Sequence, residues 1–322
     1  MQNSVCITDT HLAVPDPDSQ CLFPRHIDGL PPRERAIAYQ VMRDDIEDAY
    51  RAALGWIADR MGGRLRAWNA TIHLGDVTGG WREQGMAHPL AQAEARRCKS
   101  DLALYADRDY YALGNHDLGY THVASLGHGL NLASVEAAEG IFGPLFWTFT
   151  TDGVLSLGVC SSLAECASSD AAIRRRSEEQ REFIGDTLSA WKGPWILYAH
   201  APSTPRWFAK EIERHVPTMQ RMICGDMHDN RKGDMRKRIA NAIPMGIIPS
   251  RARRVLLACE RKLVVCPSTA PLWWRGYGLL TVKTNPWITL TDPHLLSIPE
   301  NRRVAPTASA LTCLWWCVKP KP

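Results

Sequence analysis

The chain alternates short apolar runs with longer amphipathic stretches and polar turns. Between residues 31 and 63, apolar positions recur at helical spacing from Ile37 to Met61, with Pro31 and Pro32 before them and a Gly-Gly pair after them. This pattern predicts a long helix. Five short apolar runs that end in small or polar residues instead predict buried strands, at 5–7, 72–74, 110–113, 195–198 and 222–224. A strand, a long helix and a second strand form a βαβ unit, which implies parallel pairing.

Further elements follow from the same kind of pattern. Alternation around Thr151-Asp152-Gly153 predicts a hairpin of strands at 146–149 and 154–159. A second helix is expected at 89–105, and another begins at Ser177, with 174–176 as a surface turn before it. Near the carboxyl end, strands are expected at 255–259, 263–266, 277–282 and 287–290.

Composition narrows the class of protein. The chain has 322 residues, of which 45% are hydrophobic and 22% charged, as in an ordinary soluble globular protein. Apolar stretches are too short for a transmembrane span, and we expect no membrane partner. The first strand begins too early for a signal peptide, so we expect a cytoplasmic protein with reduced thiols. The ten cysteines include no Cys-x-x-Cys pair, which argues against a zinc ribbon.

Candidate chemistry lies directly after the five predicted strands. In α/β sheets, ligands gather outside the carboxyl ends of the strands. Carboxylate, imidazole and amide donors in one set suit divalent Mn, Fe, Zn or Mg. Two such ions about 3.5–4 Å apart can clamp a phosphate and activate a water. The motifs are Asp9-Thr10-His11, Gly75-Asp76, Gly114-Asn115-His116-Asp117, the single His200, and Gly225-Asp226-Met227-His228.

This set, in this order, resembles the calcineurin-like metallophosphoesterases, from about residue 4 to residue 228 and more loosely to about 283. The resemblance implies two divalent metal ions, with Asp76 bridging them. It implies that His116 contacts the substrate phosphate or protonates the leaving oxygen, and that Asp117 orients His116 by accepting its other ring N–H. The implied ligands of the first metal are Asp9, His11 and His228, and those of the second are Asn115, His200 and Asp226.

One position departs from the family pattern. The motif Gly-His-x-His is Gly225-Asp226-Met227-His228 in this chain. With Asp226 as an oxygen ligand, the second metal has one nitrogen donor, which favours Mn²⁺ or Mg²⁺ over Zn²⁺. We therefore expect Mn²⁺ first, with Fe, Zn or Mg as alternatives. In the other interpretation Asp226 ligates nothing, and the second metal site is weak or empty.

The resemblance and the element pattern together predict an α/β fold. The expected architecture is a four-layer α/β/β/α sandwich, in which two mixed β-sheets pack face to face with helices outside. We expect one metallophosphoesterase domain over 1–291, with a basic insertion at 229–254 and a carboxyl-terminal tail over 292–322. Residues 266–270 and 276–278 resemble the closing strands of the branch that hydrolyses cyclic nucleotides.

The predicted function is hydrolysis of a phosphodiester or phosphomonoester, such as a cyclic nucleotide or nucleotide, through attack by a hydroxide held between the metals. Arg206, Trp207 and His122 are candidate substrate-binding residues, and His128 follows the same loop as His122. Two alternatives stay open. One is a nuclease that binds nucleic acid through the basic segment 231–262, in which ten Lys and Arg face two acids. The other is a catalytically weak phosphate-binding protein, because of Asp226. The basic segment is equally compatible with an ordinary solvated surface, and the sequence gives no oligomeric state.

Overall fold

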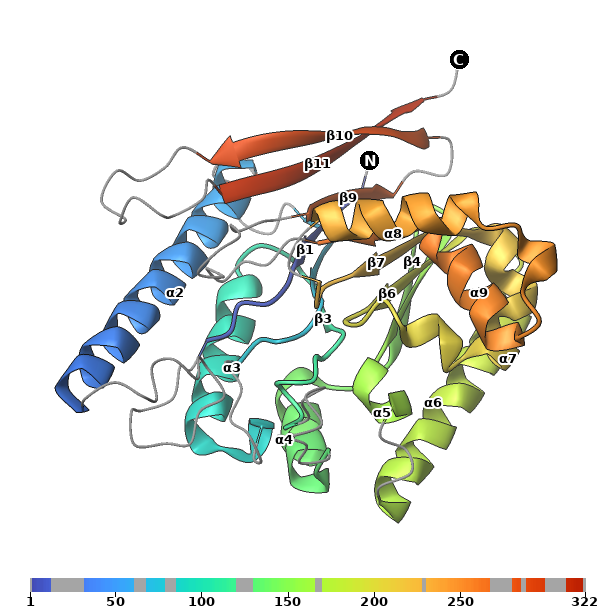
Figure 1. Ribbon diagram of the computed structural model, residues 1–322. Coiled ribbons are helices and arrows are strands. Elements are labelled where there is room, and N and C mark those ends of the chain that lie inside the picture. Colours follow the sequence, from blue (N-terminus) through green and yellow to red (C-terminus); the bar gives the residue numbers. More distant parts are fainter. Residues whose placement is uncertain are drawn as a thin grey trace.

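The structure is a computed structural model of the 322-residue chain (Figure 1). It describes residues 2–12, 32–60, 68–78, 85–119, 130–165, 170–227, 230–266, 280–284, 288–298 and 311–320. Within these ranges the protein is an α/β fold with two mixed sheets. The prediction of two mixed β-sheets is confirmed.

The first sheet carries three parallel strands that lead to predicted ligands. β1 (Gln2–Ile7) pairs with β2 (Ala70–His73), and β2 pairs with β3 (Asp109–Tyr111), all in parallel. On the other side of β1, β9 (Leu280–Thr284) runs antiparallel. β11 (Leu311–Pro320) and β10 (Ile288–Ile298) complete the order β10-β11-β9-β1-β2-β3.

The second sheet has the order β4-β5-β6-β7-β8. β4 (Trp147–Thr151) and β5 (Val154–Val159) form the predicted hairpin, whose turn residues Asp152 and Gly153 both have positive φ. From β5 onward the strands are parallel. They are β6 (Trp195–Ala199), β7 (Met219–Cys224) and β8 (Leu263–Val265).

Helices pack against each sheet, as Figure 1 shows. α2 (Pro32–Arg60), α3 (Pro89–Leu102) and α4 (Leu132–Phe142) contribute to one core cluster, together with Val5 and Ile7 of β1. α6 (Ala171–Ala190), α7 (Ala209–Ile212) and α9 (Arg251–Glu260) contribute to another, with alternate residues of β5, β6 and β7. A third cluster joins the two sheets. It includes Ile72 of β2, Leu74 directly after that strand, and Ile196 and Tyr198 of β6. The other helices of the described ranges are α5 (Ser161–Glu165), α8 (Asn230–Ala242), η1 (Gly85–Ala87), η2 (Thr204–Arg206), η3 (Glu213–Thr218) and η4 (Met245–Ile247).

Two predicted elements are wrong. Residues 174–176 do not form a turn, because α6 begins at Ala171, where the Asp170 side chain accepts hydrogen bonds from the Ala172 and Ile173 amides. Residues 255–259 are not a strand but part of α9, which buries Val255 and Cys259, four residues apart, on one face. The pattern of apolar residues around 255–259 was too short to separate the two periods.

The remaining sequence predictions of elements hold with small shifts. The long helix is α2, which begins at Pro32, and the helix predicted at 89–105 is α3, which ends at Leu102. The strand predicted at 277–282 is described from Leu280 onward, and residues 267–279 lie outside the described ranges. Residues 292–322, assigned to a tail, include much of β10 and all of β11, which belong to the first sheet; the domain boundary at 291 stays a prediction.

Two general features bear on the setting of the site. None of the helices in the described ranges combines the length and apolarity that crossing a membrane requires. Six cysteines of the described ranges are buried free thiols, at positions 6, 98, 160, 224, 259 and 266.

Candidate metal centre

The candidate ligands lie where parallel strands end side by side. The register pairs Ile7 with His73 and His73 with Tyr111, so β1, β2 and β3 stop at one level. In the second sheet the register pairs Ala199 with Cys224 at the ends of β6 and β7. All five predicted strands are present, and the loops after them carry Asp9, Asp76, Asn115, His200 and Asp226.

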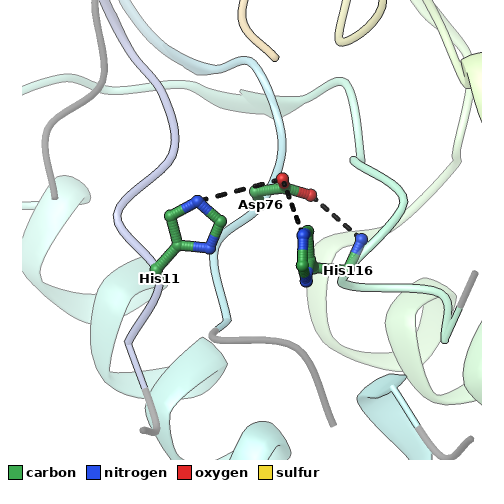
Figure 2. Close-up of side chains that lie close together, drawn as sticks. All are labelled: His11, Asp76 and His116. Carbon is green, nitrogen blue, oxygen red and sulfur yellow. Dashed lines mark hydrogen bonds and ion pairs between the residues drawn. The ribbon is translucent and has the colours of Figure 1, made fainter. Parts of the chain in front are cut away.

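Asp76 lies at the centre of these loops. Its Oδ2 is 3.3 Å from Nε2 of His200, 3.9 Å from Nε2 of His116 and 4.0 Å from Nε2 of His11. Its other oxygen, Oδ1, accepts a hydrogen bond of 3.0 Å from the His116 backbone amide. Figure 2 shows the rings of His11 and His116 both directed at this carboxylate. One carboxylate oxygen therefore faces imidazoles from both sheets.

Among the residues that the structure describes, two groups of side chains have the spacing of a metal site. His11, Asp76 and His116 form one, and Asp9, Asp76 and His200 form the other, with ligand atoms within 4.8 Å of one another in each. Asp76 belongs to both. The grouping differs in detail from the resemblance, because Asp9 lies with His200 and because His116 lies among the ligands of the other group.

The chemistry of the donors fits divalent ions. Ligand atoms about 2.0–2.2 Å from one ion lie up to about 4.4 Å apart, which is close to the spacing of these two groups. Asp9, Asp76 and His200 are almost fully buried, and His11 is 5% exposed. Buried carboxylates beside imidazoles are ligands for Mn, Fe or Zn. The residues present therefore fit a pair of metals with Asp76 in common.

The backbone is strained at four of the candidate ligands. Five residues other than glycine have positive φ in the described ranges, and four of them are Asp9 (51°), His11 (46°), Asp76 (53°) and Asp226 (56°). Residues held in this region cluster at functional sites, because the surroundings must over-determine them. The fifth is Asp152 in the hairpin turn.

Three glycines let the loops approach closely. A Cβ on Gly75 would lie 2.4 Å from the Gly114 amide nitrogen, and a Cβ on Gly114 would lie 2.0 Å from Oδ1 of Asp76. A Cβ on Gly225 would lie 2.1 Å from Oγ1 of Thr8 and 3.0 Å from Oδ2 of Asp9. Contacts below 3.0 Å are not tolerated by real Cβ atoms. Each of these glycines precedes or neighbours a ligand, so the loops require them.

The first ligand loop is tied to the second by main-chain bonds. The amide of Asp9 donates to Gly75 O at 2.9 Å, and the amide of His11 donates to Asp76 O at 3.0 Å. The Thr8 hydroxyl donates to Oδ2 of Asp9 at 2.6 Å. With Oδ2 accepting this bond, Oδ1 of Asp9 is the oxygen nearest His11, at 3.8 Å from its Nε2.

His200 is oriented by the first sheet although it follows β6. Its Nδ1 lies 2.7 Å from Leu74 O, and because a carbonyl only accepts, Nδ1 carries the proton and donates. Its Nε2 then faces Asp76 and lies 3.2 Å from Oδ1 of Asn115. A backbone carbonyl that fixes the tautomer of a ligand histidine in this way is common at metal sites.

His200 and Asp76 follow strands of different sheets, and each shifts the pKa of the other. Burial alone lowers the pKa of His200, but the charge and hydrogen bond of Asp76 outweigh it and hold that pKa well above the ordinary value. Burial alone raises the pKa of Asp76, but His200 and His116 outweigh it and hold that pKa well below its ordinary value. Before metal binds, His200 and Asp76 therefore form a buried ion pair.

Asp117 is fully buried beneath the same loop. Its Oδ1 accepts from the Thr78 amide at 3.1 Å, and its Oδ2 accepts from the Gly114 amide at 3.0 Å. Burial, followed by the charge of Asp76, raises the pKa of Asp117 to about 7 against these amide bonds. Asp117 thus shapes the turn that carries Asn115 and His116, and its predicted bond to the ring of His116 stays a prediction.

Among the described candidate ligands, Asp226 of the last motif is the least enclosed. Oδ1 of Asp226 lies 3.9 Å from Nε2 of His200, and the Asp226 side chain is 32% exposed. Its role as a ligand stays a prediction. His228, the predicted third ligand of the first metal, lies outside the described residues, as do His122 and His128.

Arg206 and Trp207 lie six and seven residues after His200. The Arg206 guanidinium lies 4.4 Å from the centroid of the Trp207 ring and is 47% exposed. The indole N–H of Trp207 donates to Oε1 of Glu165 at 3.3 Å, which also accepts from the Ser203 hydroxyl. The half-exposed Arg206 guanidinium thus lies over the Trp207 ring and 4.0 Å from Oε1 of Glu165. Its contact with substrate stays a prediction.

Much of the basic segment is engaged in structural contacts. Arg236 pairs with Glu260, and Arg251 and Arg254 pair with Glu213. The guanidinium of Arg261 and the amine of Lys262 donate to backbone carbonyls, among them Ala240 O and Val216 O. Five of the ten cations therefore stabilise α8, α9 and η3.

The sequence motifs predicted the candidate ligands but not the buried residues that hydrogen-bond beside them. Thr8, Thr10 and His73 are fully buried and hydrogen-bonded within or beside the first two motifs. A signal was present, since Thr8 and Thr10 alternate with the ligands Asp9 and His11. His73 is the last residue of β2 and is packed in the interior, with an exposure of 0%.

Comparison with known proteins adds little to this geometry. No protein-family model and no curated protein matches the chain. Among solved structures, the crystal structure of Phosphopantetheinyl Hydrolase (PptH) from Mycobacterium tuberculosis is similar with a TM-score of 0.35. The match has 13% sequence identity and covers 71% of this chain and 84% of that chain. A similarity of this size carries no argument about the reaction, so the function is argued from the site.

Proposed function

We propose that this protein is a metal-dependent phosphoesterase that uses two divalent ions, most favourably Mn²⁺. The observation that carries the proposal is the position of Asp76. Its carboxylate is common to both groups of potential ligands, and three histidines from both sheets face one of its oxygens. A carboxylate common to both groups could hold two ions close together, and two ions about 3.5–4 Å apart can stabilise the attacking and leaving oxygens of an in-line displacement.

In this proposal most of the site residues would bind the metal ions, and one residue would donate a proton. Asp9, His11 and Asp76 would hold one ion, together with His228. Asp76, Asn115, His200 and Asp226 would hold the other. Ions bound there would supply Lewis-acid activation of water and of the phosphoryl oxygens.

His116 is the residue we assign to the leaving group. Its ring stands at 90° to that of His11, with centroids 5.2 Å apart, at the edge of the buried cluster. Its side chain is 16% exposed, whereas that of His11 is 6% exposed. A histidine at the more open side of the ligands is placed to give a proton to a departing alkoxide.

We also infer that the chain has the four-layer arrangement of the calcineurin-like metallophosphoesterases. The third core cluster supports it, since it combines residues of β2 with residues of β6 and β7. The other two clusters combine each sheet with its own helices. This is the distribution expected when two sheets pack face to face.

We favour a small phosphate ester, such as a nucleotide or cyclic nucleotide, as the substrate. The stacked guanidinium of Arg206, after the His200 loop, would offer a planar donor to a phosphate. A nuclease is less favoured, because half of the basic segment is paired within the protein. A nuclease would lose affinity for oligonucleotides steeply with salt, whereas a small-ester enzyme would not bind them.

The test is hydrolysis of bis(p-nitrophenyl) phosphate and p-nitrophenyl phosphate by metal-free protein reloaded with Mn²⁺. We expect turnover that requires Mn²⁺ and that EDTA abolishes. An Asp76→Asn variant purified in parallel controls for a contaminating phosphatase. If wild-type protein holds two metals per chain and releases no p-nitrophenol with Mn²⁺, Fe²⁺, Zn²⁺ or Mg²⁺, the phosphate-binding alternative replaces the enzyme.

A further inference from the structure

His73 is the last residue of β2 and belongs to neither of the two groups of candidate ligands. Its Nε2 is 3.1 Å from the Thr10 hydroxyl, and its Nδ1 is 3.2 Å from the Gly75 amide nitrogen. Its ring stacks at 17° on that of Tyr111, with centroids 6.1 Å apart. The side chain thus contacts all three parallel strands or the loops that follow them.

The hydrogen bonds determine which ring nitrogen carries the proton. The Gly75 amide can only donate, so Nδ1 accepts and has no proton. The Thr10 hydroxyl donates to Val77 O at 2.9 Å, so its oxygen accepts from Nε2–H. His73 is therefore a neutral imidazole in the Nε2–H form, and burial, which lowers its pKa to about 3, keeps it neutral at physiological pH.

Both partners of the ring lie directly beside ligands. Thr10 separates Asp9 from His11, and Gly75 precedes Asp76. These three ligands all have positive φ, a conformation that side chains other than glycine rarely adopt. Such conformations persist only where the surroundings impose them.

We propose that His73 is a positioning residue, whose neutral imidazole joins the Asp9–His11 loop to the Asp76 loop and sets the distance between the metal ligands they carry. The inference rests on the proposed two-metal function. An imidazole suits this role because its two nitrogens accept from one loop and donate to the other on opposite sides of a rigid ring. Removal of a residue that supports metal ligands typically weakens metal binding about 10–100-fold.

The test compares Mn²⁺ affinity, by calorimetric titration of metal-free protein, in wild type, His73→Phe and Thr71→Val. His73→Phe keeps a ring against Tyr111 and removes both hydrogen bonds. Thr71 lies two residues earlier on the same face of β2 and is also buried, so Thr71→Val is a matched control. We expect Mn²⁺ affinity to fall about 10–100-fold in His73→Phe and to stay unchanged in Thr71→Val.

A second pair of variants tests the bond itself. Thr10→Val removes the hydroxyl that accepts from His73, whereas Thr10→Ser retains it. Thr10→Val should weaken Mn²⁺ binding, and Thr10→Ser should bind Mn²⁺ as wild type does. In the double variant His73→Phe/Thr10→Val the loss of Mn²⁺ affinity should be less than the sum of the two single losses, because the bond between the two side chains is lost in both single variants. Thr10→Val and Thr10→Ser also test the proposal on their own if His73→Phe does not fold.

The outcomes separate positioning from simple stability and from the proposed function. If the variants unfold at lower temperature in EDTA but bind Mn²⁺ as wild type does, His73 only stabilises the fold and the inference is wrong. If wild type binds Mn²⁺ tightly but hydrolyses no phosphate ester, the proposed function fails while the affinity comparison still stands. A wild-type protein that binds no Mn²⁺ would overturn both.

Discussion

The two sheets contribute to the candidate metal centre in different ways. The first sheet supplies Asp9, His11 and Asp76 on loops that are buried, strained and joined by main-chain hydrogen bonds. The second sheet supplies His200, which is buried but oriented by Leu74 O of the first sheet, and Asp226, whose side chain is 32% exposed. The candidate ligands after the strands of the first sheet are therefore held by the backbone of their own loops. The candidate ligands after the strands of the second sheet depend on contacts with the first sheet.

This difference has a consequence for metal binding. A rigid set of ligands binds an ion without the cost of ordering loops. We therefore expect the ion held by Asp9 and His11 to bind first and more tightly. The ion that would use Asp226 should bind second and be the one whose identity is easiest to change.

The change expected to have the largest effect is Asp76→Asn, because Asp76 is the residue that both halves share. The amide keeps the size of the side chain but removes the charge that faces three histidines. We expect phosphodiesterase turnover to fall to background and Mn²⁺ content to fall below two per chain, by elemental analysis after gel filtration. Retention of two tightly bound metals would show that Asp76 does not bridge them.

His116→Ala should lower turnover by about 10²–10⁴-fold if His116 is the general acid. Metal content should stay at the wild-type level, since the other ligands remain. The alternative is that His116 binds metal, because it also lies in one of the two groups of candidate ligands. If metal content and turnover fell together, His116 would be a metal ligand, grouped with His11 and Asp76, and not the proton donor.

Gly225→Ala should disturb the contact between the two halves. A methyl group there would lie 2.1 Å from Oγ1 of Thr8 and 3.1 Å from Leu74 O, so the β7 loop must move away from the first sheet. We expect a loss of about 1–3 kcal/mol in unfolding free energy, from urea melts, together with weaker Mn²⁺ binding. Gly185→Ala in α6 is the control, since nothing lies within 4 Å of its added methyl; it should stabilise by about 0.5–1 kcal/mol. Equal effects of the two variants would contradict the close approach at Gly225.

Asp226→His should have the smallest effect on turnover and the clearest effect on metal choice. It introduces the histidine that the Gly-His-x-His motif carries at this position, and imidazole favours Zn²⁺ more than a carboxylate does. We expect the ratio of Zn²⁺ to Mn²⁺ affinity at the weaker site to rise about tenfold or more, a change of about 1.4 kcal/mol. An unchanged ratio would mean that residue 226 does not bind metal.

The sequence was most informative about the strands and the ligands that follow them. Five short apolar runs and the motifs after them led to five observed strands with the expected loops, because strand ends and ligand chemistry are both local. Helix boundaries near charged residues were harder to predict, as at 174–176, where three arginines look like a turn. Within α6, Arg175 and Arg176 pair with Glu179, and Arg176 also pairs with Glu139 of α4.

The support beneath the ligands could not be predicted. Whether His73 packs, binds metal or holds two loops depends on what lies 3 Å away, and its partner Thr10 is 63 residues distant in the chain. The same holds for Gly225, whose need for a small side chain comes from Thr8 and Leu74 of the other sheet. Contacts between segments so far apart carry no local pattern.

In the proposed site, Asp76 joins two metal ions in one centre. Electron paramagnetic resonance of metal-free protein titrated with Mn²⁺ tests it directly. We predict a six-line signal from a single ion at low loading, replaced near two ions per chain by the exchange-coupled spectrum of a bridged pair. Saturation at one ion, or two ions that remain uncoupled, would contradict the shared carboxylate and with it the two-metal phosphoesterase.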